Sequence, residues 1–327
     1  MFDHGRLAAG LRLAPFALDV TALTLADAGR QLSASGQLAA DAAGWAVALD
    51  AGIDRIPADR LLMLWPVRFL PGTRSWLAAN VREGTLTDVR ATLRAAPEGG
   101  PPTLSLDYDY ADAAVRLLPG LPPLTGVDGH ATLADNVYTL QVRAGRVEPP
   151  EGGPIDIAGS VFRVPDTTQM PGTAEIRVAA RGAVTAMLSL LDQPPLRLAA
   201  AAGIVPSVAA GDAAVTADLT LPLADGLTPA DVTFAATGIL TDVVSTTLVP
   251  GRRLAAAALR LTADTGGVEI AGPLTIDGVA ADVAWRQPLG AGAGPARLTG
   301  TVALSPAFAR AFLPGLPAGA LSGAGRA

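Results

Sequence analysis

The sequence predicts a mainly β protein, built on a long antiparallel sheet with a few short helices. Two observations carry this prediction. Apolar and polar residues alternate in short stretches along the chain, and Asp-Gly or Pro-Gly pairs, which favour turns, close many of these stretches. Because successive residues of a strand point to opposite faces, each stretch has one apolar and one polar side, as strands of antiparallel sheets do.

The alternation recurs from one end of the chain to the other. Apolar residues at a spacing of two are, in chain order, Phe16, Leu18 and Val20; Trp45, Val47, Leu49 and Ala51; Leu104, Leu106, Tyr108 and Tyr110; Tyr138, Leu140 and Val142; Leu219, Leu221 and Leu223; Leu274 and Ile276; Val283 and Trp285; and Leu298, Gly300, Val302 and Leu304. Polar residues such as Thr139, Gln141 and Arg143 stand between them. Each stretch is therefore predicted to be a strand with one dry side.

Short helices are predicted to interrupt these strands. Their ranges are 57–64, 73–82, 183–191 and 306–312. Pro57 suits the first position of a helix, Thr73 can cap the second helix, and Pro194 follows the end of the third. Trp76 and Leu77 are expected to pack inward.

A repeated motif suggests that the sheet grows by the addition of similar units. Its copies are Arg68-Phe69-Leu70-Pro71-Gly72, Arg116-Leu117-Leu118-Pro119-Gly120 and Arg310-Ala311-Phe312-Leu313-Pro314-Gly315. Divergent repeats are expected where stacked units bury a continuous apolar surface. We therefore interpret residues 1–327 as one repeating segment, with sub-repeats expected over 1–95, 96–180 and 181–327.

Composition excludes several classes of protein. Half of the residues are apolar and only 17% are charged, which is opposite to the pattern of disordered chains. The net charge is -6 and the arginines are scattered, so a nucleic-acid partner is not expected. The chain has no Cys, which excludes disulfides and thiolate chemistry. Aromatic residues make up 4%, and much of the apolar content is Ala, so the interior is predicted to be lightly filled.

The residues that carry most enzyme chemistry are sparse. The only histidines are His4 and His130; His130 follows an Asp-Gly pair and is interpreted as a solvated turn residue. Asp107, Asp109 and Asp112 form the densest acidic cluster, which could hold calcium or act as a carboxylate pair. Apolar residues alternate with these acids, so the exposed side of a strand explains the cluster better. We therefore expect a protein without enzymatic activity, metal or cofactor.

No targeting or membrane-spanning segment is visible in the sequence. The longest uncharged apolar run, Leu198 to Ala210, contains Gly203 and Pro206 and is shorter than the roughly 20 residues that cross a bilayer. The last residues, 321–327, stop where a further strand is expected to begin. We therefore expect this chain to be a piece of a longer protein, with any anchor or export signal elsewhere.

Two interpretations of the apolar face remain open on alternation alone. In the first, two faces fill one another in a closed β-sandwich or barrel, as in a structural or adhesive module. In the second, the sheet is open and curved, and its dry side is a groove for apolar ligands. Alternation by itself favours the closed core, whereas abundant Ala and few aromatic residues favour a hollow interior.

Some blocks of the sequence are more specific than alternation. They are Trp65 to Gly84, which contains Thr73-Arg74-Ser75-Trp76-Leu77 and then Asn80-Val81-Arg82-Glu83-Gly84; the Pro-rich stretch Leu118 to Gly129; and Gly182 to Leu196, which contains Leu190-Leu191-Asp192-Gln193-Pro194-Pro195-Leu196. These blocks resemble the YhdP branch of the AsmA-like bacterial envelope proteins. The resemblance covers residues 54–223, and it includes no catalytic residues.

The resemblance implies a repeating β-groove protein, in which a long, curved, taco-shaped sheet forms an open groove. It implies a place in the periplasm or cell envelope. Members of the family are anchored in the inner membrane, and no such anchor is visible in this sequence. It also implies that phospholipids move along the groove between the inner and outer membranes, whose components are reached through other parts of the protein. No cofactor is implied.

The alternation supplies the candidate lining of such a groove. The candidates are Leu18, Val20, Leu49, Leu106, Tyr108, Tyr110, Leu140, Val142, Leu219, Leu221, Ile276, Val283, Trp285 and Val302.

Overall fold

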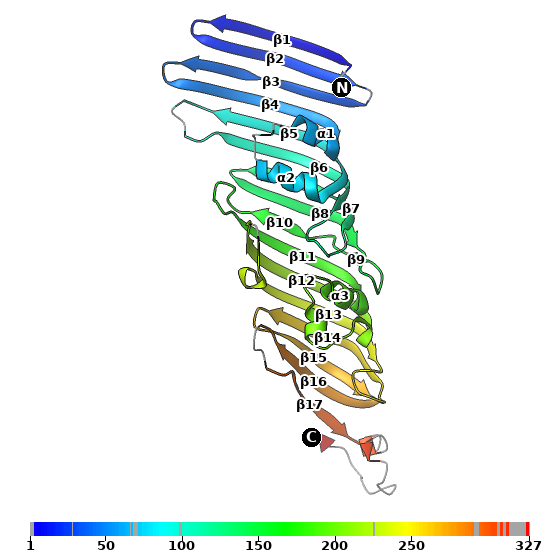
Figure 1. Ribbon diagram of the computed structural model, residues 1–327. Coiled ribbons are helices and arrows are strands. Elements are labelled where there is room, and N and C mark those ends of the chain that lie inside the picture. The colour runs from blue at the N-terminus through cyan, green and yellow to red at the C-terminus, as the bar shows by residue number, and fades with distance from the viewer. Residues whose placement is uncertain are drawn as a thin grey trace.

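Antiparallel strands follow one another in chain order to form one long sheet (Figure 1). The structure is a computed structural model that describes residues 3–326, apart from 28, 66, 68–70, 98–99, 225, 291–293, 306–307, 310–311 and 314–324. Strands β1 to β8 pair in succession, and β9 and β10 share one position between β8 and β11. Strands β11 to β17 continue in succession. The predicted long antiparallel sheet is therefore confirmed.

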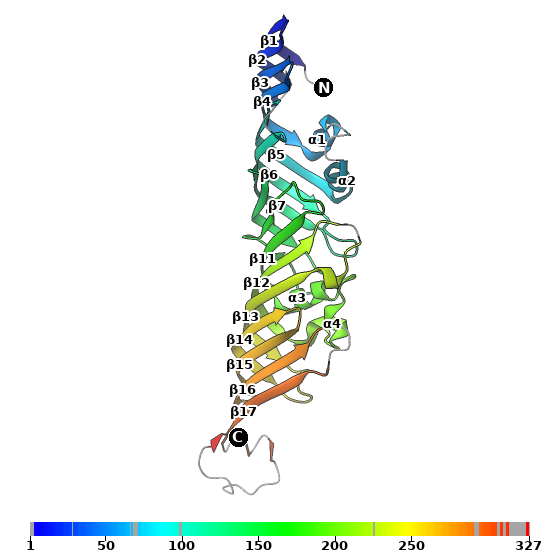
Figure 2. The ribbon, with the colours of Figure 1, turned by 90° about the vertical axis from the view of Figure 1, so that its left-hand side faces the viewer.

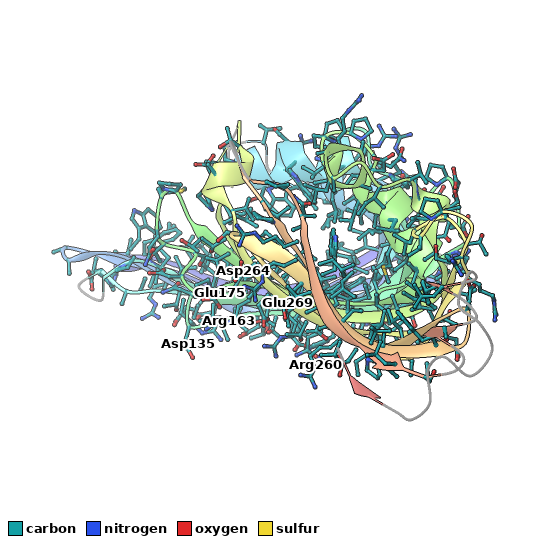
Figure 3. The ribbon with its side chains drawn as sticks, turned by 90° about the horizontal axis from the view of Figure 1, so that it is seen from below. Asp135, Arg163, Glu175, Arg260, Asp264 and Glu269 are labelled. Atoms are coloured by element: carbon teal, nitrogen blue, oxygen red, sulfur yellow. The ribbon has the colours of Figure 1, made fainter. Side chains whose placement is uncertain are left out.

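Most strands are long. Their bounds are β1 (His4–Leu13), β2 (Phe16–Asp27), β3 (Arg30–Asp41), β4 (Gly44–Pro57), β5 (Val81–Ala95), β6 (Thr103–Val115), β7 (Leu124–Ala134), β8 (Val137–Val147), β9 (Ile155–Asp156), β10 (Val161–Val164), β11 (Thr173–Ala183), β12 (Ala210–Pro222), β13 (Thr233–Ser245), β14 (Leu254–Asp264), β15 (Gly267–Ile276), β16 (Val279–Pro288), β17 (Arg297–Leu304) and β18 (Gly325–Arg326). Seen from one end, the sheet is curled rather than flat (Figure 3). Within the described residues the strands belong to this one sheet, so a closed sandwich of two sheets is not what forms.

Tight turns join several of the strands. Asp135 (φ 50°) and Asn136 (φ 61°) connect β7 to β8, and Asp277 (φ 51°) and Gly278 (φ 81°) connect β15 to β16. Positive φ at both central residues is the two-residue hairpin turn that matches the twist of the flanking strands. Asp277-Gly278 is thus one of the predicted Asp-Gly turns. The other interpreted Asp-Gly turn, at residues 128–129, is wrong, because both residues lie within β7.

Extra residues bend the strands. The pairing of β5 with β6 shifts at Asp88 (φ 53°), and the pairing of β6 with β7 shifts at Asp112 (φ 52°). A bulge of this kind leaves one residue unpaired, kinks its strand and increases the local twist. Asp tolerates the left-handed conformation better than most residues. These bulges contribute to the curl of the sheet.

The helices lie on one side of the sheet (Figure 2). They are α1 (Ala58–Leu64) and α2 (Pro71–Asn80), between β4 and β5, and α3 (Val184–Leu191) and α4 (Leu198–Ala201), between β11 and β12, with short 3-10 turns η1 (Pro206–Val208) and η2 (Pro229–Asp231). The helices predicted over 57–64, 73–82 and 183–191 are thus present. The second begins at Pro71, so Thr73 lies inside it and is not its cap, and Trp76 is exposed rather than packed inward.

Parts of the repeat interpretation differ from the structure. Pro71-Gly72 begins helix α2, whereas Pro119-Gly120 lies in a turn, so these copies of the motif do not share one local structure. Residues 68–70 and most of the third copy lie outside the described residues, as do residues 306–307 and 310–311 of the last predicted helix; Phe308 and Phe312 are helical. The expected boundary between residues 180 and 181 falls inside β11.

Buried apolar residues gather on the side of the sheet that faces the helices. The largest cluster joins Val184 of α3 to Leu240, Leu254, Leu259 and Leu274 of the sheet. A second cluster joins Ala186 of the same helix to residues on β8 and on the segment around β9. A third lies between β6 and β7. The core is therefore discontinuous, and it covers only part of the sheet.

Candidate functional site

The candidate site is the face of the sheet on which α3 packs, which we name the inner face; the opposite face is the outer face. Residues directly opposite one another in paired strands point to the same face. This rule lets one face be followed across the sheet from strand to strand. For example, Val20 pairs with Gly36, Gly36 with Leu49, Leu49 with Leu93, and Leu93 with Leu104.

The register places every predicted lining residue on the inner face. Leu140 pairs with Phe162, Phe162 with Ile176, and Ile176 with Leu219, which links the middle of the sheet to its second half. The residues brought onto this one face are Leu18, Val20, Leu49, Leu106, Tyr108, Tyr110, Leu140, Val142, Leu219, Leu221, Ile276, Val283, Trp285 and Val302. Their role in binding a ligand stays a prediction.

The inner face carries almost no charge over the described sheet. Followed through the register from β1 to β17, its paired positions hold one ion pair, Asp27 with Arg30 at the turn between β2 and β3, and no other Asp, Glu, Arg or His. The other polar side chains on it are Tyr108, Tyr110, Tyr138, Ser245 and Gln287. A charged group on this surface would lose hydration without gaining a partner, whereas apolar atoms meet no such cost.

The outer face has the opposite character. Arg177 directly faces Asp218 across β11 and β12, with Nε to Oδ1 at 2.8 Å, and Arg163 faces Glu175 across β10 and β11 at 2.7 Å. Arg163 and Glu175 lie together on this side in Figure 3, as do Arg260, Asp264 and Glu269. Apart from the Asp27–Arg30 pair, the charged side chains of the paired strands therefore lie on the outer face.

All 3 tyrosines of the chain gather at one place on the inner face, on β6 and β8. The hydroxyl groups of Tyr108 and Tyr138 lie 2.8 Å apart, and Tyr110 donates a hydrogen bond of 2.7 Å to the carbonyl oxygen of Gln141. The ring of Tyr138 meets that of Phe162 edge to face. Burial raises the pKa of all three phenols, so they are neutral at physiological pH.

Exposure of the inner face differs along the sheet. On β1, Leu7, Leu11 and Leu13 are 64%, 63% and 77% exposed, and Leu298 of β17 is 67% exposed. In the middle, Leu240 is only 7% exposed. The apolar surface is thus open to solvent toward both ends and filled near α3.

Sequence reasoning missed several inner-face strands. Ile176 and Leu240 were not singled out, because Ala and Gly dilute the alternation around them: β13 reads Phe234, Ala236, Gly238, Leu240 on its inner side. Phe162 was missed because β10 spans only 4 residues. Small residues at alternate positions between larger apolar ones are the signal that could have found these strands.

Asp107 and Asp109 of the acidic cluster lie on the outer face and face basic side chains there. Asp109 Oδ1 accepts a hydrogen bond of 2.8 Å from Arg143 and lies 3.1 Å from Nδ1 of His130. Asp107 lies 3.6 Å from Arg90. His130 is therefore a strand residue of β7 between carboxylates, and its interpretation as a turn residue is wrong. Within the residues that the structure describes, no group of three or more His, Asp or Glu side chains is placed to hold a metal ion.

None of the described helices is long and apolar enough to cross a membrane. Comparisons of this chain with protein-family models, with curated proteins and with solved structures found no match.

Proposed function

We propose that the inner face binds the acyl chains of phospholipids and that the protein is a lipid-conducting groove segment. The observation that supports this proposal is the apolar inner face, which continues from β1 to β17 across the described sheet and whose one charged pair, Asp27 with Arg30, lies at the turn between β2 and β3. A closed structural core would need large side chains and full burial along its length. Here much of the surface is Ala and Gly, and leucines at both ends remain open to water.

The dimensions of the sheet suit such a role. Neighbouring strands lie about 4.8 Å apart, so the path along the inner face from β1 to β17 is roughly 70 Å. One leaflet of a bilayer has a hydrocarbon thickness of about 15 Å. The inner face is therefore several times longer than one acyl chain, and its open stretches toward both ends offer room for such chains.

The energetics favour a continuous surface over separate binding sites. Each buried CH₂ group of an acyl chain contributes about 0.8 kcal/mol, so a whole chain exposed to water would cost on the order of ten kcal/mol. Open apolar surface removes most of this barrier along its length, since the chain exchanges one apolar contact for the next. The process requires neither a cofactor nor covalent chemistry.

The resemblance to AsmA-like envelope proteins supplies the setting of the proposal. In that setting the segment lies in the periplasm and moves phospholipids between the inner and outer membranes. Contact with components of either membrane is made through other parts of a longer protein.

Paired substitutions on opposite faces of one strand test the proposal. Leu221→Asp places a carboxylate on the inner face of β12, and Thr220→Asp, its neighbour, places the same group on the outer face. Leu49→Asp and Ala48→Asp form a second pair on β4, where Leu49 is 40% exposed. Native mass spectrometry and solvent extraction then identify co-purified phospholipid in each folded variant.

We expect bound phospholipid in the unmodified protein and in the outer-face variants, and loss of it in the inner-face variants. Equal lipid occupancy in both members of each pair would overturn the groove. A lipid-free protein that unfolds when Leu221 or Leu49 is changed would instead favour a structural or adhesive module. Leu140 is less suitable for this test, because it packs against the buried cluster of Tyr110 and Val127.

A further inference from the structure

Two tyrosines of the inner face form a pair of hydroxyl groups that has one hydrogen to spare. The hydroxyl oxygens of Tyr108 on β6 and Tyr138 on β8 lie 2.8 Å apart, and either oxygen can be the donor. A phenol has a single O–H and donates one hydrogen bond. One hydroxyl of this hydroxyl pair therefore donates to the other, whose own hydrogen has no acceptor among the described residues.

The third tyrosine of the inner face differs from the hydroxyl pair. Tyr110 donates its hydrogen to the carbonyl oxygen of Gln141 and is only 6% exposed. Tyr108 and Tyr138 are only partly buried. The spare hydrogen of the pair can therefore be reached from the inner side of the sheet, whereas that of Tyr110 is used within the protein.

A small residue on the strand between them lets the two rings meet. Tyr108 lies opposite Ala131 of β7, which is fully buried, and Tyr138 lies opposite Leu133, the next inner-face residue of the same strand. The ring of Tyr138 is also held edge to face by Phe162. The hydroxyl pair thus has a fixed place on interior strands of the sheet, away from both ends of the chain (Figure 1).

The surroundings of the hydroxyl pair favour a neutral acceptor. The one ion pair of the inner face, Asp27 with Arg30, lies at the turn between β2 and β3. A carboxylate or phosphate bound at the hydroxyl pair would leave water without a cation on the surrounding strand positions, which is costly. A carbonyl oxygen carries no net charge and can accept the spare hydrogen, so that both groups are hydrogen-bonded.

We infer that the hydroxyl pair binds the ester carbonyl of an acyl chain that lies on the inner face. This inference rests on the proposed function and adds a selectivity to it: ester-linked chains bind in preference to the same chains linked through ether bonds. Leu106 and Leu140, which lie on the same face beside the pair, offer apolar contact to the chain. The phosphate headgroup, which meets no cation here, stays in water.

Two lipids test this inference. Dipalmitoyl phosphatidylcholine and its dihexadecyl ether analogue have the same headgroup and the same chain length, but only the first has ester carbonyls. The whole chain, freed of lipid, receives an equal mixture of both in detergent, and native mass spectrometry measures the ratio of the two bound lipids. We expect the ester lipid to be favoured about fivefold, which is the effect of one hydrogen bond.

Substitution by Phe removes only the hydroxyl group and gives a distinctive pattern. Tyr108→Phe and Tyr138→Phe each leave one hydroxyl with a free hydrogen, so each single variant should keep the preference. The double variant has no hydroxyl at this place and should bind both lipids equally. Tyr110→Phe is the matched control and should keep the preference, because its hydroxyl is bonded to Gln141. Circular dichroism checks that each variant is folded.

Other outcomes overturn the inference. Equal binding of both lipids by the unmodified protein would show that water takes the spare hydrogen, and it would leave the groove itself standing. A preference that survives in the double variant would place the ester elsewhere on the inner face. Tighter binding of palmitic acid, abolished in the double variant, would assign the pair to a free carboxyl group instead of an ester. Binding of neither lipid would overturn the proposed function together with this inference.

Discussion

The first strands of the sheet and its middle follow the same pattern of alternation but bury very different amounts of it. Strands β1 to β4, the open end, carry Leu7, Leu11 and Leu13 largely exposed. Strands β6 to β16, the packed part, bury Leu240 and Leu259 on the same inner face. Alternation therefore determines which side chains lie on the inner face. The curvature of the sheet and a covering helix determine whether those side chains are buried.

Helix α3 is the main cause of the difference. Its Val184 joins the cluster around Leu240, and its Ala186, which is fully buried, joins the cluster around Ile155. Helices α1 and α2 stand near β4 and β5 but bury none of their own residues completely. The packed part therefore has a conventional core on its inner face, whereas the inner face of the open end is exposed.

The largest expected effect comes from truncating the same residue type in the two regions. Leu240→Ala should lower the free energy of unfolding by about 3 kcal/mol, because it leaves a cavity in a packed cluster. Leu11→Ala should change it by less than about 0.5 kcal/mol, because the side chain is already in water. Urea unfolding followed by circular dichroism measures both. Similar losses in the two variants would break the comparison.

A glycine pair sharpens the same comparison. A Cβ atom at Gly129 of β7 would lie 2.0 Å from the carbonyl oxygen of Gln141 and 2.2 Å from the hydroxyl of Tyr110, whereas one at Gly10 of β1 would meet nothing within 4 Å. Gly129→Ala should therefore destabilise the protein by about 2 kcal/mol through overpacking. Gly10→Ala, on the outer face of the open end, should leave the urea midpoint unchanged, and a loss at Gly10 as large as that at Gly129 would contradict overpacking as the cause.

The tyrosine cluster predicts a pH dependence confined to the packed part. Because burial raises the pKa of Tyr138 in the folded state, its stabilising contribution is complete below the unfolded pKa of about 10 and is lost as pH rises above that value. Tyr138→Phe should make the decline in unfolding free energy between pH 9 and 11 shallower. A decline of equal slope in both proteins would assign the effect to other groups.

The smallest effect on stability is expected from changes on the outer face, where both regions carry exposed ion pairs. Arg94→Gln removes an ion pair with Asp50 beside the open end, and Arg177→Gln removes one with Asp218 in the packed part. Exposed ion pairs are screened by water and salt. Neither change should move the urea midpoint measurably at 0.15 M salt, and a shift in one region alone would contradict the equivalence of the outer surfaces.

The sequence by itself determined the fold class and the faces. Alternation at Leu18 and Val20, at Leu106 and Tyr108, or at Val283 and Trp285 has a period that only a strand satisfies, so the side on which these residues lie follows from local geometry. It also located helices α1 to α3 within a few residues, and Pro57 and Pro194 mark limits of the first and third. Where Ala and Gly replace larger residues, as in β13, the local signal was too weak.

Only the tertiary structure decided how these strands share one surface. The register between distant strands, such as Ile176 opposite Leu219, depends on contacts that no local pattern encodes. Bulges at Asp88 and Asp112 and the position of α3 then set which part of the inner face is filled and which stays open. Alternation is a property of single strands, whereas burial is a property of how they curve and what packs on them, and that is the physical reason for the division.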